Sequence, residues 1–339
     1  MTGHKHATIP VFVPHLACPN QCVFCNQKRI SGALDIPEDP YPMLREAAKG
    51  LSDRFDEVDI AFFGGSFTGI GKEKMTVYLS AANRIRREFP KIRGLRLSTR
   101  PDYIDEEIVS FLLSFGVTAV ELGVQSLDDR VLTLSGRGHS AADTVQAVSL
   151  LRRTPFEIVL QLMPGLPGDT LQTIRQTAQK AAELVCDAVR IYPCVVIRDT
   201  PLAESYQNGT FTPLSLESAV EICADMAEFF REREIRILRM GLHSSDLVEN
   251  GGVIAGPFHP AFGEMVEQRL ALRKICRGLT GNLSGKEKKG MIFVPPGRVS
   301  KTVGQKRANL SELKRRYGID FSVKEDLLLS GEDFRLFFE

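Results

Sequence analysis

Apolar residues in this chain follow two alternating patterns. Short continuous apolar runs of strand length are separated by longer segments whose apolar residues recur at helical spacing. Continuous apolar runs are typical of parallel strands that are buried on both faces of a sheet. The predicted strands are Ala7–Val13, Val58–Phe63, Gly94–Ser98, Val117–Val124, Phe156–Leu162 and Asp187–Tyr192.

The segments between these runs predict helices, several with a capping residue at the start. Ser140 and Asp143 form an S-x-x-D capping box, and Asp105 precedes another helix. The predicted helices are Pro42–Phe55, Lys72–Arg87, Asp105–Phe115, Ala141–Arg153, Thr170–Leu184 and Leu216–Arg233. Six strand–helix units predict an α/β fold, a partial (β/α)6 TIM-like barrel. In such folds the chemistry lies at the carboxyl ends of the strands.

The strand–helix alternation fades after about residue 280, so we expect two domains, 1–280 and 286–339. Between them, the polar segment Gly281–Gly290 is typical of a linker. The second domain is expected to be a small α+β module. Its predicted elements are a strand at Met291–Val294, a helix at Leu310–Tyr317 and a strand at Ile319–Val323.

The C-terminal module is basic. Lys286–Lys324 holds eleven Lys and Arg against three acids, a net +8, which leaves −7 for the rest of a chain whose formal charge is +1. This asymmetry indicates a phosphate-bearing partner. The turn Gly304-Gln305-Lys306-Arg307 before a helix resembles part of a KH RNA-binding domain, with Arg307 in place of the second glycine. The alternative is a solvated basic face that only caps the barrel. Candidate RNA contacts are Lys301, Lys306, Arg307, Arg315 and Arg316.

The composition and the first residues of the chain indicate where in the cell the protein is expected to act. Apolar residues make up 43%, enough for a sizeable core, and no run reaches the roughly 18 apolar residues that span a bilayer. The polar start Met1–His6 is unlike a signal peptide, so we expect a cytoplasmic protein without a membrane contact. Seven cysteines in a long chain do not indicate a disulfide framework. Four of them, Cys186, Cys194, Cys223 and Cys276, are far apart and are expected to be buried.

The other three, Cys18, Cys22 and Cys25, have C-x3-C-x2-C spacing and can converge on one metal centre. With only three thiolates, a four-iron cluster would keep one iron free of protein, which favours catalysis over electron transfer. The alternative is a structural zinc site, with His15 as the fourth ligand.

About 40 residues later an apolar run ends in Gly64-Gly65-Ser66. The three-cysteine loop followed by a strand and this Gly-Gly turn resembles the radical S-adenosylmethionine (SAM) superfamily. That resemblance implies a [4Fe-4S] cluster on Cys18, Cys22 and Cys25, whose fourth iron binds SAM. Reductive cleavage of SAM then yields a 5′-deoxyadenosyl radical, with a reductant such as flavodoxin or ferredoxin as electron donor.

Further segments resemble the radical SAM half of the Elongator catalytic subunit, a family that modifies the wobble uridine of transfer RNA. They are Ser98–Tyr103, Gly123–Ser126, Arg137–His139, Met163–Gly168 and Ile191–Arg198. Some of them also resemble oxygen-independent coproporphyrinogen oxidase. The resemblance implies SAM contacts at Phe24, Gly64, Gly65, Ser66, Ser98, Gln125, Arg137 and Gln161.

Two features depart from those families. Ser98 stands where they commonly have a glutamate that contacts the ribose, and the chain has no room for an acetyltransferase domain. Three functions therefore stay open. The first is a radical SAM enzyme acting on RNA, with transfer RNA favoured. The others are a radical SAM enzyme for a small molecule or tetrapyrrole, and a non-catalytic RNA-binding metalloprotein. His243 and His259 could reach the barrel mouth or be structural.

Overall fold

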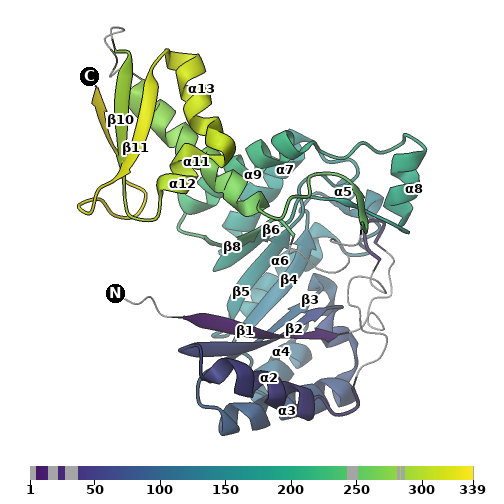
Figure 1. The fold of residues 1–339 in the computed structure, drawn as a ribbon. Helices are drawn as coiled ribbons and strands as arrows, with labels where there is room; N and C mark the ends of the chain where they lie inside the picture. The colour runs from purple at the N-terminus through teal and green to yellow at the C-terminus, as the bar shows by residue number, and fades with distance from the viewer. Residues whose placement is uncertain are drawn as a thin grey trace.

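A computed structural model describes residues 5–13, 22–26, 37–242, 251–280, 283 and 287–338 (Figure 1). Most of the chain forms a curled parallel sheet with helices on its outer side, and a smaller module follows at the C-terminus. The predicted partial barrel is therefore confirmed. Among the described residues, no helix is long and apolar enough to cross a membrane.

The main sheet has seven parallel strands, and their order in the sheet follows the order of the chain, β1-β2-β3-β4-β5-β6-β8. Six strands lie where the apolar runs predict them. The bounds are β1 His6–Val13, β2 Glu57–Gly64, β3 Ile92–Thr99, β4 Ala119–Gln125, β5 Glu157–Leu162, β6 Ala188–Ile191 and β8 Arg236–Met240.

The seventh strand, β8, is missing from the sequence prediction. It pairs in parallel with β6 at the edge of the sheet, and its side chains are half-buried or exposed. An edge strand need not be apolar on both faces, so its alternating Arg-Ile-Leu-Arg-Met sequence gives only a weak signal.

Two of the helices that cover the sheet begin at the predicted capping residues Ser140 and Asp105. The Ser140–Asp143 capping box is present, and the Asp105 side chain accepts from the backbone N–H of Ile108. The bounds are α2 Tyr41–Ser52, α3 Lys72–Glu88, α4 Glu106–Ser114, α5 Asp129–Leu134, α6 Ala141–Leu151, α7 Leu171–Glu183, α8 Pro201–Gln207 and α9 Leu216–Arg231. Short 3-10 turns follow β2 and β3, and a two-stranded ribbon pairs β7 (Val196–Ile197) with β9 (Val253–Ala255).

The C-terminal module is a three-stranded sheet with helices on one face. Its strand order is β11-β10-β12, with β11 parallel and β12 antiparallel to the central β10. The bounds are β10 Lys289–Val294, α12 Val299–Val303, α13 Ala308–Tyr317, β11 Asp320–Glu325 and β12 Arg335–Phe338. The predicted strand–turn–helix–strand order is confirmed. The predicted linker is too long by two residues, because Lys289 and Gly290 already belong to β10.

Helix α11 (Phe262–Leu279) joins the two parts. Its first half packs into the barrel core through Phe262, Val266 and Leu270. Its second half packs into a separate core of the C-terminal module through Leu272, Ile275 and Leu279. The division between the two cores therefore falls inside one continuous helix.

Candidate active site

The carboxyl ends of the barrel strands surround a pocket of about 200 Å³. All eight residues that the sequence resemblance implies as SAM contacts line it, together with two of the three cysteines. They are Phe24, Gly64, Gly65, Ser66, Ser98, Gln125, Arg137, Gln161, Cys22 and Cys25. Residues from the ends of four strands, β2 to β5, from the segment after α5 and from the cysteine loop thus share one cavity, as expected for a barrel of this type.

The described part of the cysteine loop is fixed to the barrel by backbone hydrogen bonds. The N–H of Val23 donates to Ser135 at 3.1 Å, and the Val23 carbonyl accepts from the N–H of Leu202 at 2.8 Å. A turn brings the N–H of Cys25 to the carbonyl of Cys22 at 3.0 Å. Phe24 is buried in an apolar cluster that also contains Leu166, Val196 and Leu202. The loop therefore holds both thiols at the pocket wall.

Cys18, His15 and His243 lie outside the described residues, so the third predicted cluster ligand and the zinc alternative are not placed. Within the described ranges no three potential ligand side chains come together. His259 is placed, and its Nδ1 accepts from the backbone N–H of Ala261 at 3.1 Å, beside the start of α11. That bond gives His259 a structural role.

Arg137 lies against the cysteine loop. Its Nη1 donates to Cys22 Sγ at 3.3 Å, and its Nη2 donates to the carbonyl of Gly123. Its Nε is buried and finds no acceptor among the described residues. Burial and the nearby Arg137 charge lower the pKa of His139 to about 4, so that imidazole is neutral at physiological pH. Arg137 therefore supplies the positive charge at this wall of the pocket.

Gln125 has the backbone conformation of a functional position. It is buried with φ +67°, a left-handed conformation that costs energy for a side-chain-bearing residue. Its Oε1 accepts from Gln161 Nε2 at 3.1 Å, so two of the predicted contacts form one polar pair. Gly123 leaves them room, because a Cβ there would lie 3.1 Å from Gln125 Nε2 and 3.3 Å from Arg137 Nη2.

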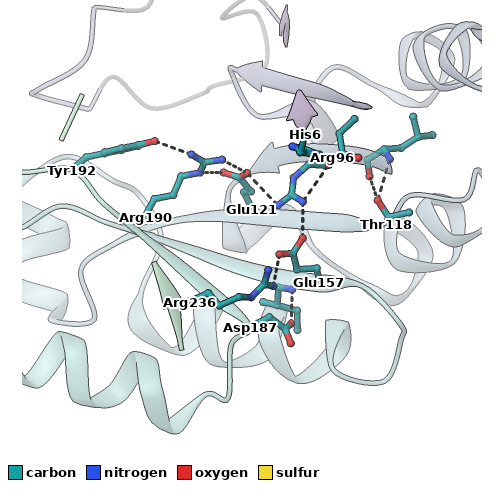
Figure 2. Close-up of polar contacts among 12 residues, drawn as sticks. His6, Arg96, Thr118, Glu121, Glu157, Asp187, Arg190, Tyr192 and Arg236 are labelled. Atoms are coloured by element: carbon teal, nitrogen blue, oxygen red, sulfur yellow. Dashed lines mark hydrogen bonds and ion pairs between the residues drawn. The ribbon is translucent and has the colours of Figure 1, made fainter. Parts of the chain in front are cut away.

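Below the pocket, charged side chains cross the inner face of the sheet (Figure 2). One comes from each of the five strands β2 to β6, namely Asp59, Arg96, Glu121, Glu157 and Arg190. Arg96 Nη1 lies 2.6 Å from Glu157 Oε2 and 3.6 Å from Asp59 Oδ2. These charged side chains are offset from one another in strand register, and they replace the apolar interior that is usual for such barrels.

Glu121, one of the residues that line the pocket, is held in place by Arg190. Arg190 donates to both carboxylate oxygens of Glu121, at 2.8 and 3.0 Å, and to the phenol oxygen of Tyr192 at 3.4 Å. Burial opposes the charge of Arg190, but its pKa is raised because the Glu121 carboxylate accepts its hydrogen bonds. Glu121 and Tyr192 line the pocket. Glu121 also pairs in register with Ser98, so a carboxylate lies beside the position where the resembling families carry a glutamate.

Sequence reasoning did not identify this network or Arg100, another buried residue of the pocket wall, which pairs with Asp102 at 2.8 and 2.9 Å. A signal was present, because single charged residues such as Asp59 and Glu121 interrupt strands that are otherwise apolar.

The predicted RNA contacts in the C-terminal module fall into three groups. Lys306 and Arg307 are exposed on the turn before α13, both with left-handed φ, and Arg307 occupies the N-cap position. Arg315 and Arg316 both pair with Glu312. Lys301 lines a small cavity with Glu267, Glu332 and Asp333. Lys306 and Arg307 therefore form no ion pair within the described part of the chain, and they lie beside a helix N-terminus, where anions bind readily.

The turn itself is firmly held. Gly304 has φ +76°, and a Cβ there would come within 3.0 Å of Asn309. The buried Asn309 amide donates to the carbonyls of Gln268 and Thr302, and the N–H of Gln305 donates to Gln268 Oε1 at 3.0 Å. The Lys306–Arg307 turn is thus preorganised by α11.

Comparison with known proteins gives two family matches. The profile of the Radical SAM superfamily matches residues 12–181, and that of the Radical_SAM C-terminal domain matches residues 186–271.

Individual relatives and solved structures point to one group. The chain is 30% identical to the tRNA uridine(34) acetyltransferase of Methanocaldococcus infernus over 64% of its own length and 48% of the relative. It is 28% identical to Elongator complex protein 3 of Saccharomyces cerevisiae, over 62% and 45%. The structure of Methanocaldococcus infernus Elp3 with an N-terminal deletion superimposes with a TM-score of 0.66 at 25% identity, over 80% of this chain and 64% of that one. The chain spans about half the length of the curated relatives that it matches.

Proposed function

The chain belongs to the radical SAM superfamily, and from that premise we propose that it is a SAM-cleaving enzyme with a [4Fe-4S] cluster whose substrate is RNA, with transfer RNA as the favoured class. The observation that carries the proposal is the single pocket shared by the cysteine loop and every residue expected to contact SAM.

The residues present fit the cluster and SAM. Thiol sulfur is the ligand that iron–sulfur clusters take, and Cys22 and Cys25 present it at the pocket wall. The guanidinium of Arg137 lies beside one of these sulfurs, and its buried Nε has no acceptor among the described residues. A guanidinium in this position can bind a carboxylate such as that of the methionine part of SAM.

The bound cluster and SAM supply the electron transfer and the bond cleavage that produce a 5′-deoxyadenosyl radical. The residues of the chain would bind the cluster and SAM and orient them. Cys18, Cys22 and Cys25 would hold the cluster, and Arg137 donates to the Cys22 sulfur, which fixes the orientation of that side chain. Gln125 and Gln161 present a paired amide surface to the SAM ribose and carboxylate. A flavodoxin or ferredoxin is the proposed electron donor.

An RNA substrate is supported by two independent observations. Relatives that match the barrel are named for modification of uridine 34 of transfer RNA. The C-terminal module presents Lys306 and Arg307 on a rigid turn before α13. The decisive experiment compares modified nucleosides by mass spectrometry in cells with and without the gene. A nucleoside that disappears and is restored by the wild-type gene, but not by a Cys22→Ala gene, supports the proposal. An unchanged set of nucleosides contradicts it.

Gly123→Val is expected to weaken SAM binding about tenfold or more while leaving the iron content near the wild-type level. The new side chain must push the Gln125 amide and the Arg137 guanidinium, and overpacking of this kind costs about 1–3 kcal/mol. Calorimetric titration with SAM checks this. Gly50→Val on the surface of α2 is the matched control, because a Cβ at Gly50 meets nothing within 4 Å. Equal SAM affinities for the two variants would remove Gly123 from the site.

Lys306→Glu/Arg307→Glu is expected to lower transfer RNA affinity and to reduce the salt dependence of binding by about one to two units of the log–log slope. Each phosphate contact releases counterions when it forms, so a variant that makes fewer contacts releases fewer counterions on binding. Filter binding at several salt concentrations checks this. Arg315→Glu/Arg316→Glu is the matched control, because both of these arginines already pair with Glu312. If the first double variant melts like wild type and binds with an unchanged slope, the turn is not an RNA contact.

A further inference from the structure

The C-terminal sheet buries only one of its two faces. On the inner face Ile292, Val294 and Phe321 pack with α11 and α13. The other face, here called the outer sheet face, consists of the alternate positions of the three strands. These positions are Lys289, Met291 and Phe293 on β10, Asp320, Ser322 and Lys324 on β11, and Arg335 and Phe337 on β12. In Figure 1 this sheet forms the outer edge of the molecule, away from the barrel.

Aromatic and basic side chains alternate across this face. In one row the register places Phe293 between Lys324 and Arg335. In the next row Met291 lies opposite Phe337, whose side chain is 57% exposed. The guanidinium of Arg335 lies 5.3 Å from the centre of the Phe293 ring and is held by Asp326. Two aromatic rings and a thioether thus lie between cations that fixed strand pairing keeps in place.

The charge of the face indicates what covers it. The eight outward positions carry three cations and one carboxylate; Asp320 pairs with Lys314 at 2.8 Å and Arg335 pairs with Asp326, so the remaining positive charge of the face comes from its lysines. A surface that packs against another protein core is depleted in lysine. Of the two aromatic rings, Phe337 is exposed and Phe293 is half-buried, and rings that lie among lysine and arginine are suited to a polyanion whose repeating units have flat faces.

We propose that the outer sheet face stacks unpaired bases of a single-stranded RNA segment, with Phe293 and Phe337 under the bases and Lys324 and Arg335 beside the phosphates. This rests on the proposed RNA substrate and deepens it, since it specifies a looped or unpaired segment. A duplex presents its bases only at groove edges, so it cannot use such a surface. The Lys306–Arg307 turn contacts phosphates only and would not distinguish single-stranded from paired RNA.

The test measures binding of the full-length protein to a fluorescent single-stranded RNA of about ten nucleotides and to a duplex of equal length. Phe337→Ala is expected to weaken single-strand binding about tenfold, because one stacked base is lost, with the salt slope unchanged. Duplex binding should stay within about twofold of wild type. Lys324→Gln is expected to weaken single-strand binding and to lower its salt slope by about one unit, because one phosphate contact is lost, while duplex binding stays near the wild-type level.

Tyr206→Ala is the matched control. Tyr206 is also an exposed aromatic residue, but it lies on α8, on the opposite side of the molecule from the C-terminal module (Figure 1). It should bind both RNAs like wild type. Thermal melting of every variant identifies loss of fold, and Phe293→Leu, which keeps apolar bulk but removes the ring, repeats the test at the second aromatic position.

Three outcomes would overturn the proposal. One is single-strand binding by the folded Phe337→Ala and Phe293→Leu variants that equals wild type. Another is an equal loss of duplex binding. The third is a wild-type dimer that Phe337→Ala converts to a monomer without a change in RNA affinity, which would make the face a contact between two copies. SAM cleavage without RNA and the cellular nucleosides are measured separately. A further possible result is that the variants of the outer sheet face bind RNA normally in a protein that is still required for a modified nucleoside. That result would refute the proposed role of this face and leave the proposed function standing.

Discussion

Cys22→Ala is expected to abolish reductive SAM cleavage and to lower the bound iron. Cys22 is buried at the pocket wall, where Arg137 contacts its sulfur. Three thiolates hold three of the four irons and leave one iron open for SAM. Loss of Cys22 would therefore leave a second iron without its protein ligand. Anaerobic reconstitution, iron analysis and chromatography of 5′-deoxyadenosine measure the effect. Full iron and full product from the variant would refute the cluster assignment.

Cys194→Ala is the matched control for that experiment. Cys194 lies in the same apolar cluster as Cys22, but it does not line the pocket. Burial raises the pKa of its thiol to about 12, so it stays protonated at neutral pH. This variant should keep its iron and lose only some stability, because loss of the sulfur atom leaves a small void.

Glu121→Leu is expected to destabilise the barrel by about 3–5 kcal/mol, because it leaves the Arg190 charge in the interior without its partner. The two side chains are 4% and 19% exposed and share two hydrogen bonds. Denaturant unfolding measures the effect. Glu46→Leu is the control: Glu46 is 81% exposed, and its pair with Lys49 is of the surface type that contributes at most about 1 kcal/mol.

The double variant Glu121→Leu/Arg190→Met should recover most of the stability that the single variant loses, since an apolar pair of similar volume can replace a buried ion pair. Its SAM or substrate affinity should nevertheless fall, because Glu121 lines the pocket and Arg190 holds Tyr192, which also lines it. A single variant as stable as wild type would show that Arg190 reaches solvent without cost.

The sequence was sufficient where the signal is local. Each of these signals spans only a few residues of the sequence. They are the spacing of Cys22 and Cys25, the Gly64-Gly65 turn and the apolar runs that predict the strands. The ion pairs of Arg96 with Glu157 and of Arg190 with Glu121 join residues 61 and 69 positions apart. Such pairs depend on strand register, which one sequence does not reveal.

The sequence prediction missed two other features, each for its own reason. Strand β8 lies at an edge and is half-polar, so its composition resembles that of a loop. The outer sheet face becomes visible only when β10, β11 and β12 are paired, because Phe293, Lys324 and Arg335 are distant in the chain. The basic composition of the module was readable, but the placement of aromatic rings between the cations was not.

The sharing of helix α11 between two cores limits how this protein can be recombined. A junction drawn at the polar segment after residue 280 would separate the C-terminal sheet from Leu272, Ile275 and Leu279, which belong to its core. The barrel would then retain these three apolar side chains without a partner, and the transplanted sheet would lack the helix that completes its core. Gene fusions that exchange this module between relatives should therefore join the sequences before Phe262, so that the whole helix travels with one partner and its barrel-facing half is matched to the recipient.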